Sequence, residues 1–401
     1  MLQMWERWFR FYLRRAIING KLSVEFPSGE IFVIGEDSAE PIKLKITNEK
    51  ALKSLCLNPS LALGETYMDE GLIIEGDDLK GLGELVFVNI ANLEQAPIPK
   101  FMNFFMKCIR TITQFNSQIR ARKNIKHHYD LTDELYVLFL DKDRQYSCAY
   151  FTSQENSLEQ AQIDKKDHIA KKLLIEPGMD ILDIGSGWGG LGLTLAKDYG
   201  ARVKGVTLST EQHKISNRRA REEGLADQVD FSLMDYRAVK DKFDRIVSVG
   251  MFEHVGVPHY REYFSSIRNL LKEDGVALLH TIGRSSPPAG TNAWLARYIF
   301  PGGYVPALSE TMRAIEKEGL MVNDIEFLRL HYAETLAHWY MRFMSNIDRI
   351  RDIYDDRFCR MWRYYLIMCE MSFRYGGLAV FQIQLSHKND IVPITRDYLY
   401  K

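Results

Sequence analysis

A chain of 401 residues, of which 46% are hydrophobic and 26% charged, is long enough for two domains and apolar enough to bury a core, which excludes a disordered protein. The net charge of −1 excludes a general electrostatic attraction to nucleic acid, so no nucleic acid is expected as a partner. The cysteines form no Cys-x-x-Cys pair, and no apolar run approaches the ~18 residues of a membrane span. These features favour a protein of the reducing cytoplasm. We expect no disulfide, no zinc site, no membrane span and no secretory signal.

Residues 5–18, WERWFRFYLRRAII, have the apolar periodicity of an amphipathic helix whose other side is basic. Two interpretations stay open. Such a helix lies in a membrane interface, or it packs on its own domain and leaves its arginines in water. The apolar face comprises Trp5, Trp8, Phe9, Tyr12, Leu13, Ala16 and Ile17, and the basic side comprises Arg7, Arg10 and Arg14.

Three alternating runs follow, KLSVEFPSG, EIFVIGE and PIKLKITN, and the turn residues between them predict a small sheet. With helices expected around residues 49–57 and 77–90, residues 1–93 form a small α+β domain, for which we hypothesise docking on lipid or membrane. Two prolines after this domain interrupt regular structure. A linker is therefore expected over residues 94–119, followed by a catalytic domain over residues 120–401.

From about residue 160 the pattern alternates between strands and helices. This alternation predicts an α/β, Rossmann-like fold: a mostly parallel sheet with helices on both faces. The last two strands, IEFLRL and GLAVFQIQLS, are expected to form an antiparallel edge. The other expected strands are 179–184, 202–207, 228–232, 243–249 and 275–281, and the expected helices are 158–174, 189–199, 210–223 and 258–272.

The turn in LDIGSGWGGLGLTLA follows the first of these strands and opens a helix, which is the context of a nucleotide-binding turn. Gly185, Gly187 and Gly190 have the spacing of a dinucleotide site. However, Asp183 would repel a pyrophosphate, and Thr207 stands where a nicotinamide site requires an acid. The turn therefore favours S-adenosylmethionine (SAM), which has an amino-acid end and no phosphate. A nicotinamide cofactor and a turn that binds no ligand are the alternatives.

Seven strings in order make the sequence similar to a known family: NIKHHYDLTDELYVLFLD, YSCAYF, LDIGSGWGG, GVTLSTEQ, FDRIVSVGMFEHVG, LLHTIG and LAHWYMRF. Together they resemble the cyclopropane-fatty-acyl-phospholipid synthases and the related mycolic acid cyclopropane synthases, over residues 120–400. GETYMDEG, in the first domain, resembles the phospholipid enzymes, whose additional N-terminal domain the mycolate enzymes lack. This difference favours a phospholipid as the substrate.

The resemblance implies a Rossmann-like SAM-dependent methyltransferase with S-adenosylhomocysteine as the product. The implied SAM-binding residues come from the YSC string, the glycine turn, and the ends of the second and third strands. They are Tyr146, Ser147, Asp183, Gly185, Gly187, Thr207, Gln212, Asp235 and Tyr236, with Met234 beside them.

The implied reaction adds the SAM methyl carbon to a cis double bond of an unsaturated phospholipid acyl chain and closes a cyclopropane ring. Attack leaves a carbocation on the chain, so water must stay out and a base must remove a proton from the new methyl group. The resemblance points to bound bicarbonate as this base. Its implied partners are the side chains of Glu253, His280 and Tyr340 and the backbone N–H groups of Cys148 and Ile282. Cys148 is not expected to act as a nucleophile, because no partner base lies near it in the sequence.

The acyl chain is expected to contact Tyr129, Trp294 and Tyr304. The stretch TNAWLARYIFPGGYVPALS is loop-like and aromatic, so it either lines the acyl channel as a wall or lid or is a packed crossover connection. His127 and His128 are adjacent and do not converge on one metal ion, so no metal is expected.

The resemblance also suggests peripheral association with the inner face of the membrane, from the cytoplasm, and a homodimer. Three other functions stay open: a fatty-acyl C-methyltransferase that gives a methyl-branched or methylene product, a methyltransferase for small molecules, and a non-catalytic lipid-binding relative. The bicarbonate set favours ring closure. The presence of Asp183, the glycines and Glu253 disfavours a non-catalytic relative.

Overall fold

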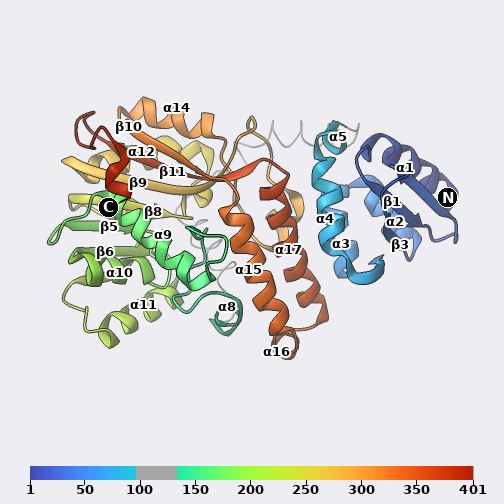
Figure 1. Ribbon diagram of the computed structural model, residues 1–401, viewed down its shortest axis with the longest axis horizontal. Helices are drawn as coiled ribbons and strands as arrows, with labels where there is room; N and C mark the ends of the chain where they lie inside the picture. The colour runs from blue at the N-terminus through green and yellow to red at the C-terminus, as the bar shows by residue number, and fades with distance from the viewer. Residues whose placement is uncertain (96–132, 401) are drawn as a thin grey trace. The chain divides into compact units, whose positions relative to one another are not determined.

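The computed structural model describes residues 1–95 and 133–400, and these form two compact units (Figure 1). The first unit takes the described part of residues 1–110 together with 289–301 and 336–377. The second takes the described part of 111–288 together with 302–335 and the described part of 378–401. Among the described residues, no helix is both long and apolar enough to cross a membrane.

A four-stranded sheet lies in the first unit, in the order β2-β1-β3-β4. Its strands are β1 (Lys21–Glu25), β2 (Ile31–Gly35), β3 (Ile42–Ile46) and β4 (Leu72–Ile74), of which the first three follow the predicted runs. The helices of this part are α1 (Leu2–Ala16), α2 (Glu49–Leu57), α3 (Pro59–Met68), α4 (Leu79–Val88) and α5 (Ile90–Gln95). Strand β4 and helices α3 and α5 are the elements of this part that sequence patterns did not predict.

Later segments of the chain complete this unit. Helix α17 (Asp356–Arg374) packs against α3 and α4, and the short helix α13 (Ala293–Tyr298) packs against α3. The first unit is therefore larger than the expected domain of residues 1–93, because its core includes residues far along the chain. Most of the expected linker, residues 96–119, lies outside the described residues.

The second unit is built on a seven-stranded sheet in the order β10-β11-β9-β8-β5-β6-β7. Pairing is parallel from β9 through β8, β5 and β6 to β7, and β11 runs antiparallel to both of its neighbours. The predicted mostly parallel sheet with an antiparallel edge is thus confirmed. The strands are β5 (Asp180–Ile184), β6 (Arg202–Thr207), β7 (Val229–Leu233), β8 (Phe243–Val249), β9 (Leu271–Arg284), β10 (Met321–Leu328) and β11 (Leu378–Ser386).

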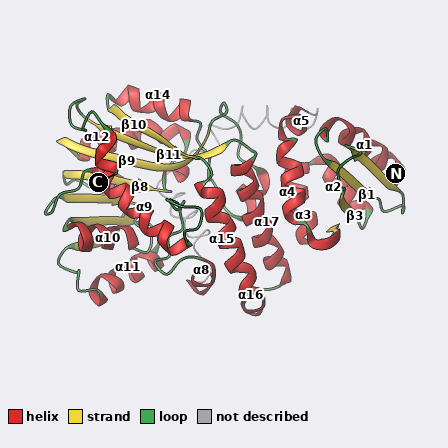
Figure 2. Ribbon diagram, viewed as in Figure 1, coloured by secondary structure: helices red, strands yellow, loops and turns green. Residues whose placement is uncertain are grey.

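Helices cover both faces of this sheet (Figures 1 and 2). On one face, α9 (Leu158–Leu173), α10 (Gly190–Tyr199) and α11 (Thr210–Glu222) bury side chains such as Leu173 and Leu195 with the strands. On the other, α12 (Tyr260–Leu270) and α14 (Leu308–Glu318) contribute Phe264 and Ile315 to a second cluster. This three-layer arrangement fixes the carboxyl ends of the parallel strands, where loops are free to form a site.

The remaining helices are α8 (Asp133–Phe139), α15 (His331–Ser345) and α16 (Ile347–Ile353). Short 3₁₀ turns, at Phe252–His254 and Val257–His259, follow β8. The stretch predicted as loop-like contains a real helix, because α13 begins where the side chain of Asn292 accepts the N–H groups of Trp294 and Leu295. An asparagine cap of this kind is a local signal that the prolines and glycines of the stretch obscured.

Candidate active site

The turn between β5 and α10 has the backbone that its glycines predict. Gly185, Gly187 and Gly189 all have positive φ, at 85°, 56° and 85°. A side chain at Gly185 would also meet Met251 at 2.9 Å. Glycine at these positions lets the chain turn sharply and lets a ligand approach the backbone.

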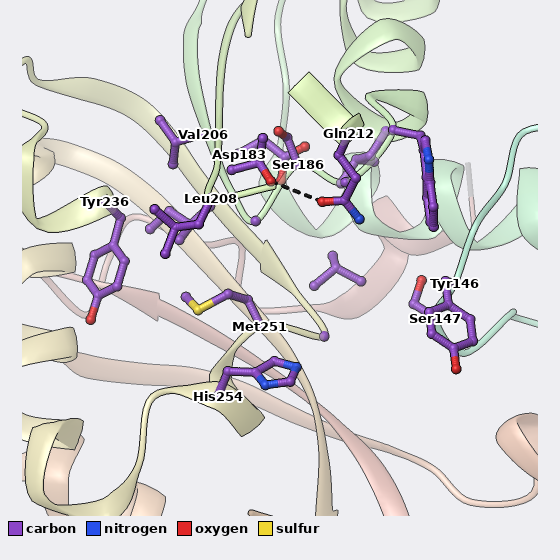
Figure 3. A pocket seen from close by; sticks show the side chains of 18 of the residues that line it. Tyr146, Ser147, Asp183, Ser186, Val206, Leu208, Gln212, Tyr236, Met251 and His254 are labelled. Atoms are coloured by element: carbon purple, nitrogen blue, oxygen red, sulfur yellow. Dashed lines mark hydrogen bonds between the residues drawn. The ribbon is translucent and has the colours of Figure 1, made fainter. Parts of the chain in front are cut away.

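A pocket opens above this turn at the carboxyl ends of the parallel strands, and Figure 3 shows its side chains. Every residue predicted to bind SAM lines it: Tyr146, Ser147, Asp183, Gly185, Gly187, Thr207, Gln212, Asp235 and Tyr236, with Met234. These residues come from four separate segments of the sequence. The fold therefore collects the predicted set, although their individual roles stay predictions.

Asp183 is the buried acid of the pocket. Its side chain is 2% exposed, and its Oδ2 has no hydrogen-bond partner within the described residues. Burial raises the pKa of Asp183 to about 7, and the positive charge of Lys165 opposes the rise. A buried carboxylate oxygen without a partner is costly, so it is suited to a ligand that brings a hydrogen-bond donor.

Thr207 and Gln212 are joined at the end of β6. The Thr207 hydroxyl donates to Gln212 Oε1 at 3.0 Å, drawn as a dashed line in Figure 3, and accepts the Ser209 N–H. Ser209 caps α11 by accepting the Gln212 N–H. The bond to Thr207 orients the Gln212 amide so that its nitrogen stays available as a donor.

Asp235 has a partner of its own. Its carboxylate accepts two hydrogen bonds from the Arg237 guanidinium, at 2.8 and 2.7 Å, and a third from the Arg237 backbone N–H. Tyr236 is buried beside it, with its ring in edge contact with Tyr263. The predicted adenine contact of Asp235 would therefore come from a carboxylate held in place by Arg237.

The pocket also includes residues that the sequence patterns did not single out, among them Lys165, Trp188, Met251 and His254. Lys165 is 1% exposed, and its ammonium donates to Gln145 Oε1 at 2.5 Å and to Ser147 Oγ at 2.9 Å. Burial lowers the pKa of Lys165 to about 8. Nothing in its local string distinguishes this lysine from its neighbours in α9, so only the fold reveals it.

The predicted base cradle lies outside the lining of this pocket, and two of its members meet directly. The Ile282 N–H donates to Glu253 Oε1 at 2.6 Å, while Glu253 Oε2 is buried without a hydrogen-bond partner in the described part of the chain. Burial raises the pKa of Glu253 to about 7. The Ile282 N–H that was predicted to hold an anion is thus bonded to Glu253.

His280 is buried on β9, where its carbonyl accepts the Gly250 N–H. The Gln382 amide nitrogen lies 3.1 Å from His280 Nδ1. In this orientation of the Gln382 amide its nitrogen donates, so Nδ1 accepts and Nε2 carries the ring proton. Burial, helped by the charges of Lys165 and Lys172, holds the pKa of His280 well below its usual value, so the ring is a neutral donor.

Cys148 is fully buried, and its thiol donates to the Ala149 carbonyl at 3.2 Å. Burial raises the pKa of this thiol. A protonated, buried thiol is a poor nucleophile, in keeping with the expectation from the sequence.

The other predicted residues are distributed over the two units. Tyr340 belongs to the first unit, where its hydroxyl is hydrogen-bonded to Arg363. Trp294 is also in the first unit and is 1% exposed, with its indole N–H directed to Met68 Sδ at 3.3 Å. Tyr304 is buried in the second unit, and its hydroxyl donates to Glu310 at 2.6 Å. Tyr129 lies outside the described residues.

No cluster of three or more His, Cys, Asp or Glu side chains suited to a metal ion occurs within residues 1–95 and 133–400. His127 and His128 lie outside these ranges.

The seven-stranded sheet, the glycine turn and the pocket with its buried acid define the chain as a SAM-dependent methyltransferase. Residues 116–383 match the family model described as mycolic acid cyclopropane synthetase, and the chain belongs to this family. Residues 12–94 match a second model, a domain of unknown function named DUF7884.

Individual relatives agree with this assignment. The chain is 39% identical, over 88% of its length and 90% of the relative, to the cyclopropane-fatty-acyl-phospholipid synthase of Escherichia coli strain K12. It is 40% identical, over 69% of its length and 73% of the relative, to a probable fatty acid methyltransferase of Pseudomonas putida. Among solved structures, the mycolic acid cyclopropane synthase CmaA1 in complex with SAH and CTAB is similar, with a TM-score of 0.62 and 32% identity over 66% of this chain and 97% of that one.

Proposed function

We propose that the protein transfers the methyl carbon of SAM to the cis double bond of an unsaturated acyl chain in a membrane phospholipid and forms a cyclopropane ring. One combined observation carries the proposal: every residue predicted to bind SAM lines one pocket, and the chain matches a phospholipid cyclopropane synthase over 88% of its length. This match, over 357 residues, is longer than the family model of the catalytic part, which covers residues 116–383.

The residues of the pocket fit SAM. Asp183 presents a buried carboxylate oxygen without a partner, suited to the ammonium group of the amino-acid end. The glycine turn lets the ligand lie against the backbone, and Gln212 presents an amide held by Thr207. SAM, when bound here, supplies an electrophilic methyl carbon. The task of the chain is to hold that carbon against the alkene and to keep water away, because water would quench the cation.

Bicarbonate as the base is part of the proposal. Glu253 Oε2, buried and without a partner in the described residues, suits the O–H of a bicarbonate ion, and the neutral His280 ring offers an N–H donor from Nε2. Ile282 then acts indirectly, because its N–H fixes the Glu253 carboxylate at 2.6 Å. Tyr340 and the Cys148 N–H complete the proposed set.

A second candidate is a fatty-acyl C-methyltransferase, favoured by the 40% identity to the probable fatty acid methyltransferase. It shares the methyl transfer and the cation but ends in a methyl-branched or methylene product. The candidates differ at the step after methyl transfer: ring closure removes a proton from the new methyl group directly, whereas a methylene product requires a hydride shift before that proton is lost. The buried, unpartnered Glu253 oxygen suits a base that removes this proton in either reaction.

We also propose that the chain works at the membrane surface from the cytoplasm, since its substrate is a bilayer lipid, and that it forms a homodimer. The acyl chain is proposed to pass Tyr129, Trp294 and Tyr304. Trp294 is buried against Met68, so its proposed role is indirect: it shapes the first unit.

Lipid mass spectrometry tests the proposal. The protein is incubated with SAM and vesicles of an unsaturated phospholipid, and the acyl chains are analysed before and after mild hydrogenation. A mass gain of one CH2, in a chain that no longer takes up hydrogen, supports ring closure. The same gain in a chain that still takes up hydrogen, or a gain of CH4 in a chain that does not, indicates the C-methyltransferase, and an unchanged chain rejects both.

A further inference from the structure

Helix α1 packs on its own unit by a narrower face than its sequence predicts. Phe9, Leu13 and Ala16 are buried, and so is Ile17 after the helix. Trp8, expected on the same apolar face, is 37% exposed. The periodicity places Trp8 at the border of that face, and α2, α5 and β2, the elements that α1 packs against, leave Trp8 partly in water.

The outer face of α1 carries a row of exposed apolar side chains. Met4 is 55% exposed, Trp8 37%, Phe11 50%, and Ile18, just after the helix, 58%. The spacing of four and three residues from Met4 to Phe11 follows one side of the helix, and Ile18 lies just beyond its end. We call Met4, Trp8, Phe11 and Ile18 the outer row. Exposed aromatic and apolar residues that form a line, rather than single points, indicate a contact surface.

The charges beside the outer row have one sign. Arg7, Arg14 and Arg15 are exposed, and the Arg15 guanidinium lies 3.7 Å from the centre of the Phe11 ring. The only acid in the helix, Glu6, is 4% exposed and accepts the Ser28 N–H. Arg10 is bound to Glu30 and lies over the Phe26 ring, so it belongs to the inner side. The outer face of α1 is therefore apolar and cationic, with no acid.

We infer that the outer row inserts into the headgroup region of an anionic phospholipid bilayer while Arg7, Arg14 and Arg15 pair with lipid phosphates. Aromatic and apolar side chains between arginines are the composition of an interfacial helix. A second copy of the chain is a poor occupant, because two faces of the same positive charge repel. The inference rests on the proposed function and adds to it which face meets the lipid.

Vesicle sedimentation tests the inference with the full chain, without SAM and with fully saturated lipids, so that no turnover occurs. Vesicles of phosphatidylcholine with phosphatidylglycerol are compared with vesicles of phosphatidylcholine alone. Trp8→Ser with Phe11→Ser, and separately Arg7→Glu with Arg14→Glu, are expected to weaken partition to the anionic vesicles about tenfold or more. Partition of the wild type should weaken as salt is raised.

Matched controls use exposed residues of the second unit. Leu233→Ser, at a 46% exposed position, and Arg218→Glu with Arg221→Glu, in α11, should leave partition unchanged. Brominated lipids should quench the tryptophan fluorescence of the wild type more than that of Trp8→Phe. This comparison reports insertion of Trp8 even if another variant folds poorly. Equal partition of the α1 variants and the wild type, or equal quenching, overturns the inference.

Failure of the proposed function is distinguishable from failure of this inference. Unsaturated phospholipid dispersed in detergent micelles removes the need for a bilayer. The α1 variants should turn over this micellar substrate as the wild type does. Absence of turnover by the wild type in micelles and in vesicles rejects the proposed function, whatever the vesicle partition shows.

Discussion

Lys165 and Asp183 place a buried base and a buried acid in one pocket, and neither has an ion-pair partner within 4 Å among the described residues. Both side chains are nearly inaccessible to water, at 1% and 2% exposed. An acid and a base that face the same pocket without neutralising partners complement a zwitterion, with the ammonium group at Asp183 and the carboxylate at Lys165. The amino-acid end of SAM is such a group.

The first prediction concerns Lys165→Met, which keeps the length of the side chain and removes its charge. A hydrogen bond to a charged group contributes about 1.5–3 kcal/mol, so affinity for S-adenosylhomocysteine should fall about 10- to 100-fold in titration calorimetry. Methylthioadenosine, which lacks the amino-acid end, should bind to both proteins equally. Lys171→Met, in the same helix at a more exposed position, is the control. An equal loss for both ligands would instead assign Lys165 to holding Gln145 and Ser147.

Glu253→Gln is the second prediction. Glutamine can still accept the Ile282 N–H but offers no carboxylate to a base, so turnover should fall about 10²-fold or more, within the range of general acid–base catalysis. Binding of S-adenosylhomocysteine should stay unchanged, since Glu253 does not line the SAM pocket. Glu273→Gln, exposed on β9, is the matched control. Parallel losses of turnover and cofactor affinity would contradict a role for Glu253 in proton removal.

A third prediction follows from the raised pKa values of Asp183 and Glu253. Burial raises the pKa of each to about 7, from 3.8 and 4.5, so the folded state binds protons that the unfolded state has released. Ionisation of these buried groups destabilises the folded state. The cost is absent below about pH 4 and grows, as the pH rises to about 7, to a loss of stability on the order of 3–4 kcal/mol per group. These two groups should therefore lower the free energy of unfolding of the ligand-free protein between pH 5.5 and pH 8, while His254 and His280, whose pKa values are lowered by burial, raise it over the same range.

Urea unfolding should show that, from pH 5.5 to pH 8, the free energy of unfolding falls less, or rises more, in Asp183→Asn and in Glu253→Gln than in the wild type, because each variant removes one carboxyl group with a raised pKa. An identical pH dependence in the wild type and both variants would show that other groups control it.

The sequence predicts features that depend on residues close together in the chain, and it does not predict features that depend on residues far apart in the chain. The strands of the second sheet and the glycine turn follow from periodicity and from residues adjacent in the chain, and the structure confirms them. Lys165 was missed because its importance arises from Gln145 and Ser147, about twenty residues away, which the fold brings to its ammonium group. Likewise, no local pattern shows that the N–H of Ile282, on β9, is bonded to Glu253, in the turn that follows β8.

Trp294 illustrates the same limit. Aromatic residues among prolines and glycines suggested a channel wall, but the indole packs against Tyr364 with ring centres 4.7 Å apart and donates to Met68. Its partners come from α3 and α17, more than sixty residues away on either side. Periodicity within the stretch carries no information about such distant partners.

The last prediction uses this contact. Gly64, in α3, lies so close to Trp294 that an added Cβ would meet the indole nitrogen at 2.4 Å. Gly64→Ala should therefore destabilise the protein by about 1–3 kcal/mol through overpacking, although alanine favours a helix by about 1 kcal/mol over glycine. Trp294→Ala should cost about 3–5 kcal/mol as a large cavity. In the double variant the clash is absent, so the Gly64 substitution should become neutral or stabilising, and urea unfolding of all four proteins measures this coupling. A Trp294→Ala protein with wild-type stability and a raised KM for phospholipid would instead place Trp294 in the acyl channel.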